Sequence, residues 1–174
     1  MILLRLNLLI SIIGLSEQKI YSCDAKRICG CSKNSAVVNR IVGGEEAGIH
    51  TWSWAVSLNI NYQSFCGGSI ISKSWIITAA HCLPSTEPYN ITIYAGSTNP
   101  WVGTQVRKVS LIIPYPFYNH ETYLHDIALL KLAEPLNLTD NTVTPICLPS
   151  FDSAQSKPTS WPSTGLPVSL FFKL

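Results

Sequence analysis

The sequence predicts an all-β domain built as a small, closed antiparallel barrel. From Ile41 onward the chain consists of short apolar or alternating runs that are rich in β-branched and aromatic residues and separated by turn formers. No window of 11 residues shows the 3.6-residue apolar period of a helix. Six runs of strand length at this spacing fit a six-stranded barrel, and 174 residues are enough for one domain with a hydrophobic core.

The six expected strands lie at residues 54–60, 67–72, 75–79, 91–95, 105–113 and 127–132. The run Ile91-Thr92-Ile93-Tyr94 alternates between apolar and polar side chains, which predicts a strand with one face toward water. The run at 127–132 is nearly all apolar, which predicts a strand buried on both faces. Turn-forming segments separate the strands at residues 59–62, 84–88 and 97–100.

The first 16 residues are typical of a secretory signal peptide. Arg5 precedes an apolar run of about ten residues, which is well short of the roughly 20 that cross a bilayer as a helix. Gly14 and Ser16 have the small side chains expected just before a cleavage site at Glu17. Residues 17–40 are polar, rich in cysteine and without periodicity, which indicates a short pro-segment. We therefore expect a secreted, extracellular protein that does not span a membrane.

An even number of cysteines fits disulfide bonding in that compartment. The chain has six of them: Cys23, Cys29, Cys31, Cys66, Cys82 and Cys147. Zinc binding is the competing interpretation. However, the segment Cys29-Gly30-Cys31 places one residue between its thiols, where zinc sites use two to four, and no histidine pair follows at the spacing of a zinc finger. We therefore expect disulfides and no metal.

The low charge of the chain limits its possible partners, and two sequons predict glycosylation. Charged residues make up 13% of the chain and the formal net charge is +2, with the basic residues scattered, so nucleic acid and anionic membranes are not expected partners. Two sequons, Asn90-Ile91-Thr92 and Asn137-Leu138-Thr139, predict N-glycosylation at Asn90 and Asn137.

Three further segments carry the functional prediction. In chain order they are Arg40-Ile41-Val42-Gly43-Gly44, Thr78-Ala79-Ala80-His81-Cys82 and His125-Asp126-Ile127-Ala128-Leu129-Leu130. Together they resemble the activation site and the catalytic histidine and aspartate loops of the trypsin-like, chymotrypsin-fold serine proteases. The resemblance extends to about Pro149. It implies that residues 41–149 form the first of that family's two six-stranded barrels.

The resemblance also implies roles for individual residues. His81 would be the general base, and Asp126 would fix the tautomer of its imidazole and stabilise the imidazolium. Cleavage between Arg40 and Ile41 by a trypsin-like protease would create a new N-terminus at Ile41. No cofactor is implied. The implied partners are protein or peptide substrates, protease inhibitors and the activating protease.

Relatives also suggest disulfide pairings. Cys66 would pair with Cys82. A pro-segment cysteine would pair with Cys147 and keep the cleaved pro-segment attached. Both Cys29 and Cys31 are candidates for this role, with Cys31 preferred, and the remaining one would pair with Cys23.

One departure from the family concerns calcium. Many trypsins bind calcium through carboxylates in a loop that corresponds to residues 97–105 here. That stretch contains no Asp or Glu, whereas calcium requires several charged oxygen ligands. We therefore expect no calcium site.

A larger departure concerns the nucleophile. No Gly-Asp-Ser-Gly-Gly occurs in these 174 residues. Residues 150–165 would begin the crossing to the second barrel, which has no counterpart here, and the tail at 166–174 matches no pattern of the family, as a splice variant or a shifted exon boundary would. The main expectation is a secreted serine endopeptidase zymogen, truncated before the nucleophile and inactive as it stands. The alternatives are a non-catalytic half-protease that binds inhibitors or proteases, and a nonproductive transcript.

Overall fold

The computed structural model describes residues 19–21, 28–32, 34, 36–38, 47–83, 87–139 and 142–149. Several predicted features lie outside these described residues: the signal at 1–16, Cys23, the cleavage site at Arg40 and Ile41, and the segments at 150–165 and 166–174.

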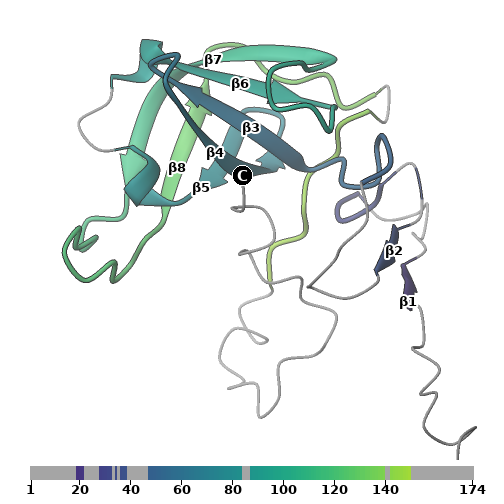
Figure 1. The fold of residues 1–174 in the computed structure, drawn as a ribbon, viewed down its shortest axis with the longest axis horizontal. Helices are drawn as coiled ribbons and strands as arrows, with labels where there is room; N and C mark the ends of the chain where they lie inside the picture. Colours follow the sequence, from purple (N-terminus) through teal and green to yellow (C-terminus); the bar gives the residue numbers. More distant parts are fainter. Residues whose placement is uncertain are drawn as a thin grey trace, which may run out of the picture.

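The described chain is dominated by a closed antiparallel barrel with strand order β3-β4-β5-β8-β7-β6 (Figure 1). The strands are β3 (Ala55–Ile60), β4 (Ser64–Ser72), β5 (Trp75–Thr78), β6 (Ile91–Ala95), β7 (Gln105–Pro114) and β8 (Ala128–Leu132). The barrel closes because β3 pairs with β4 on one side and with β6 on the other. The predicted all-β, six-stranded barrel is thus confirmed.

The barrel interior is filled by aliphatic side chains from every strand, as expected for β-branched and leucine-rich runs with one inward face. Its largest fully buried side chains are Leu58, Ile70, Ile76, Ile91, Ile93, Leu130 and Val143. Burial of each such side chain is worth about 1.5–3 kcal/mol relative to exposure. Val143 follows the last strand, so the segment after β8 also contributes to this core.

Gly68 on β4 shows how closely three strands approach one another. A Cβ atom at this position would lie 2.9 Å from Ile76 Cγ2 and 3.0 Å from Leu58 Cδ1. Both neighbours are fully buried and cannot withdraw into solvent. Only glycine therefore fits between β3 and β5 at this point.

The prediction that residues 127–132 are buried on both faces is wrong. In β8, Ala128, Leu130 and Leu132 are buried, whereas Lys131 is exposed and Leu129 is half-buried. The strand therefore alternates, as a barrel strand with one face toward the core does. Leucine at the outward position 129 hid this alternation in the sequence.

The remaining described elements are short. β1 (Lys19–Tyr21) and β2 (Ala36–Val38) pair antiparallel in a separate two-stranded sheet outside the barrel (Figure 1). The sequence did not predict them because three residues are too few to show an alternation. Two 3₁₀ helices, η1 (Ala80–Cys82) and η2 (Pro88–Asn90), follow β5 and precede β6.

A disulfide and hydrogen bonds fasten residues 29–31 to the barrel domain. Cys29 bonds Cys147, and the preference for Cys31 as the partner of Cys147 is wrong. Gly30 N donates to Pro145 O at 2.7 Å, and Thr144 Oγ1 donates to the carbonyl of Cys31 at 2.6 Å. These hydrogen bonds align residues 29–31 with residues 144–147, so that Cys29 lies beside Cys147 and Cys31 lies beside Thr144. Cys31 is itself disulfide-bonded.

Gly30 allows the backbone to adopt this alignment with residues 144–147. Its φ of 67° lies in the left-handed region that favours glycine, and a Cβ atom there would lie 3.0 Å from Cys147 Sγ. Farther along the segment, Asn34 Nδ2 donates to Ile49 O at 2.7 Å. Residues 29–34 are therefore held at two places, beside residues 144–147 and beside the loop that leads into β3.

Candidate active site

Strand pairing brings His81 and Asp126 together although 45 positions separate them in sequence. β5 and β8 are antiparallel neighbours, and Thr78 at the end of β5 pairs with Ala128 at the start of β8. The chain that leaves β5 and the chain that enters β8 therefore meet at one edge of the barrel. His81 lies in η1 three residues past Thr78, and Asp126 lies two residues before Ala128.

Asp126 contacts His81 through both of its oxygens. His81 Nδ1 lies 2.7 Å from Asp126 Oδ2, and the backbone nitrogen of His81 donates to Asp126 Oδ1 at 2.8 Å. Because an ionised carboxylate only accepts hydrogen bonds, Nδ1 carries the proton. In the neutral imidazole, Nε2 is then the basic nitrogen. The side chain of His81 is 42% exposed and that of Asp126 is 23% exposed, so solvent reaches the pair.

Electrostatics keep Asp126 ionised. Partial burial by itself raises the pKa of this carboxyl, but hydrogen bonds from the side chain and backbone of His81, with the backbone of Ala80, outweigh it and hold the pKa below its ordinary value. The carboxylate therefore stays charged at neutral pH beside His81. An anion placed there stabilises an imidazolium, so the pair can accept a proton at His81.

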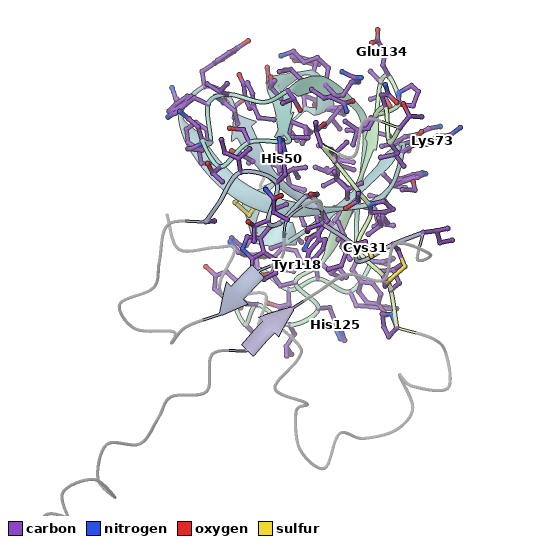
Figure 2. All side chains as sticks on the ribbon, turned by 90° about the vertical axis from the view of Figure 1, so that its right-hand side faces the viewer. Cys31, His50, Lys73, Tyr118, His125 and Glu134 are labelled. Carbon is purple, nitrogen blue, oxygen red and sulfur yellow. A yellow bond between two sulfur atoms is a disulfide. The ribbon has the colours of Figure 1, made fainter. Side chains whose placement is uncertain are left out.

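Two tyrosines of the loop before β8 lie near the pair. The ring of Tyr123 meets that of His81 edge to face, with centroids 6.0 Å apart. The pKa of Tyr118 is raised by partial desolvation and by the negative charge of Asp126, so its hydroxyl stays protonated. Figure 2 shows Tyr118 and His125 on the same side of the molecule, away from Glu134.

A disulfide fixes η1 from the other side. Cys82 bonds Cys66 of β4, as the family resemblance implied, and Cys82 Sγ lies 3.5 Å from His81 Nε2. Cys66, Cys82 and His81 have the separations of a metal-ligand cluster. However, metal ligation by cysteine requires a thiolate, and both sulfurs are consumed in the disulfide. We therefore assign this cluster a structural role.

The other predicted site residues lie apart from the pair. Asn137 is exposed in the segment after β8, and Asn90 is half-buried in η2. Of the other three histidines, His120 and His125 are exposed, and His50 is half-buried with its Nδ1 atom enclosed.

Sequence reasoning missed the aromatic neighbours of the pair. Tyr118 and Tyr123 lie between β7 and β8 in a stretch without periodicity, and no motif marked them. The signal available in the sequence was the density of aromatic residues just before Asp126.

Comparisons with known proteins point to one family. The family model described as Trypsin matches residues 41–167. Coagulation factor IX of rabbit (Oryctolagus cuniculus) is 47% identical over 122 residues, which cover 67% of this chain and 43% of that protein. Transmembrane protease serine 7 of mouse (Mus musculus) is 37% identical over 125 residues, which cover 69% of this chain and 15% of that protein. The chain thus spans less than half the length of these relatives.

Solved structures show the same likeness. The scabies mite inactivated protease paralogue S-D1 superposes with a TM-score of 0.59 at 33% identity, covering 63% of this chain and 46% of that one. The HL collagenase gives a TM-score of 0.58 at 36% identity, covering 65% and 49%. Within the part of the chain that the structure describes, no helix is long and apolar enough to cross a membrane.

Proposed function

Since the chain belongs to the trypsin family of serine proteases, we propose that it is the first barrel of a secreted serine endopeptidase zymogen. In this proposal His81 is the general base and Asp126 fixes its tautomer. The substrates are proteins or peptides, and the reaction is hydrolysis of a peptide bond through a serine nucleophile. No cofactor takes part.

The observation that carries the proposal is the double contact between Asp126 and His81. The bond from the backbone nitrogen fixes the carboxylate relative to η1, and the bond from Nδ1 orients the imidazole. If His81 had only a structural role, this contact would add little to stability, because its side chain is 42% exposed. A general base requires it, because proton transfer depends on the orientation and tautomer of the ring.

The nucleophile in this proposal comes from a second barrel that these 174 residues do not contain. Large apolar side chains gather on the loop beside the pair and are exposed, which supports a missing covering partner. These side chains are Tyr115, Phe117, Tyr123, Leu124 and Ile127. By themselves the 174 residues are then expected to be inactive, since the residual rate of a damaged triad depends on an oxyanion hole.

Secretion and activation complete the proposal. Disulfides between Cys29 and Cys147 and between Cys66 and Cys82 fit an oxidising compartment. Cleavage after Arg40 frees the N-terminus at Ile41 and leaves the pro-segment attached through Cys29. Protease inhibitors and the activating protease are the protein partners.

Sequencing of transcripts from the gene across the codon of Gly165 tests this proposal. The expected result is a product that continues into Gly-Asp-Ser-Gly-Gly and that, after cleavage at Arg40, hydrolyses peptide amides. If the reading frame of every transcript ends after the codon of Leu174, the proposed peptidase activity is contradicted.

A second candidate function is binding without catalysis. The observation in its favour is that one structural neighbour with this barrel is described as an inactivated protease paralogue. In that case the 174 residues act as a decoy for inhibitors or activating proteases. Purified 174-residue protein would then slow the inhibition of a trypsin-like protease by a macromolecular inhibitor, and the absence of any such effect would exclude the decoy.

A further inference from the structure

We propose that Tyr115 and His125 are positioning residues that hold Asp126 in the orientation in which it bonds His81. The consequence for catalysis rests on the proposed function. The contact between Asp126 and His81 is itself observed, so the positioning can be tested without activity.

The backbone around Asp126 has an uncommon conformation. His125 has φ of 58° and Tyr123 has φ of 56°, both in the left-handed region that few residues other than glycine adopt. Ile127 N donates to His125 O at 2.8 Å, which closes a tight turn centred on Asp126. Such conformations persist only where their surroundings hold them. Something must therefore restrain His125.

Tyr115 contacts the neighbours of Asp126 on both sides. Its ring packs against the imidazole of His125, with centroids 5.1 Å apart and an interplanar angle of 31°. Its backbone nitrogen donates to Ile127 O at 2.9 Å. The residue before Asp126 is thus held by a side chain, and the residue after it is held by a backbone bond from the same tyrosine.

Tyr115 is itself a stiff support. It lies between Pro114, the last residue of β7, and Pro116. Tyr118 N donates to Tyr115 O at 3.0 Å, so Pro116 takes the second position of a turn, where its fixed φ is favourable. A residue that precedes proline is also restricted to extended conformations. The backbone of Tyr115 therefore has little freedom to move away from His125.

Other hydrogen bonds of this loop act farther from Asp126. Asn119 N donates to Leu124 O at 3.0 Å, and Asn119 Oδ1 accepts from the backbone nitrogens of Glu121 and Thr122 at 2.9 and 3.0 Å. These bonds close the tip of the loop. Tyr115, in contrast, contacts His125 itself.

The test uses NMR of the 174-residue protein with Tyr115→Ala, Tyr115→Phe and Phe117→Ala. Phe117 is a matched control, because it is an exposed aromatic residue of the same loop whose ring centroid lies 6.0 Å from that of Tyr115. In Tyr115→Ala we expect the Nδ1 proton of His81 to exchange with water about tenfold faster or more, and the pKa of Asp126 to rise toward its ordinary value. Both readouts stay unchanged in Tyr115→Phe and Phe117→Ala.

His125→Asn provides a second variant, because asparagine tolerates the left-handed conformation but lacks an aromatic ring. It is expected to reproduce the effect of Tyr115→Ala. If Tyr115→Ala does not fold, His125→Asn alone tests the positioning role. A folded Tyr115→Ala or His125→Asn variant with unchanged exchange and unchanged pKa overturns the inference. A wild-type protein without the hydrogen-bonded Nδ1 proton contradicts the pair itself, and with it the proposed function.

Discussion

Asp126 accepts two hydrogen bonds from His81, one from its backbone nitrogen and one from Nδ1. The first bond ties the carboxylate to η1 whatever the orientation of the imidazole. The second then selects a single ring orientation and a single tautomer. The pairing of β5 with β8 supplies this geometry, because it sets the two chain ends side by side.

The first prediction concerns catalysis by a product of the gene that includes the serine. Asp126→Asn preserves the shape of the side chain but favours the wrong tautomer of His81, and we expect kcat to fall about 10⁴-fold. Glu121→Gln, an exposed carboxylate on the same loop, is the control and leaves kcat unchanged. Kinetics with a peptide amide measure both. An equal effect of the two substitutions contradicts the role of Asp126.

The second prediction concerns acid stability. The pKa of Asp126 is lower in the folded protein than its ordinary value of 3.8. Its stabilising contribution is therefore complete above the unfolded pKa and is lost as the pH falls through the folded pKa. Urea unfolding of wild type and Asp126→Asn should show a difference in stability at pH 7 that shrinks below about pH 4. A difference that does not depend on pH refutes this assignment.

The third prediction concerns the disulfide that attaches residues 28–33 to the barrel domain. Tryptic digestion without reduction should yield the peptide 28–33 linked to the peptide that contains Cys147, because Cys29 bonds Cys147. Since that peptide carries both Cys29 and Cys31, two variants distinguish them. Cys31→Ser should retain the linkage and Cys29→Ser should lose it, as measured by mass spectrometry. The reverse pattern would mean that Cys31 is the partner.

The fourth prediction concerns glycosylation at the two sequons. Asn137 is exposed, and Asn90 retains partial exposure in η2, so the fold can accommodate a glycan at each. In secreted protein, Asn90→Gln and Asn137→Gln should each remove one step of the mobility shift caused by a peptide N-glycosidase, and the double variant should show none. A wild-type protein whose mobility the glycosidase leaves unchanged shows that neither sequon is used.

The fifth prediction concerns the barrel core. Leu130 on β8 is fully buried, so Leu130→Ala should lower the free energy of unfolding by about 2–5 kcal/mol. Lys131→Ala changes the adjacent, exposed position and should stay within about 0.5 kcal/mol of wild type. Denaturant unfolding measures both. Equal losses would show that residue 131 faces the core instead.

The sequence predicted the barrel because its strands carry enough residues to show apolar alternation between turn formers. It also predicted His81 and Asp126, since both lie in long motif matches, although their contact depends on a strand pairing that no local pattern encodes. Two of the features that escaped prediction show the physical reasons. Nothing in the local sequence distinguishes Cys29 from Cys31, and only the backbone alignment at Gly30 decides which of them meets Cys147. The contact of Tyr115 with His125 depends on where the backbone between two prolines places the tyrosine ring.

The most direct test of the account measures peptide amide hydrolysis by the longest secreted product of the gene, before and after cleavage at Arg40. The same product with His81→Ala serves as the comparison. The account predicts activity that appears on cleavage and falls by a factor on the order of 10⁴ or more in His81→Ala. Activity that survives this substitution, or a cleaved product with no activity at all, would contradict the assignment of His81 as the general base.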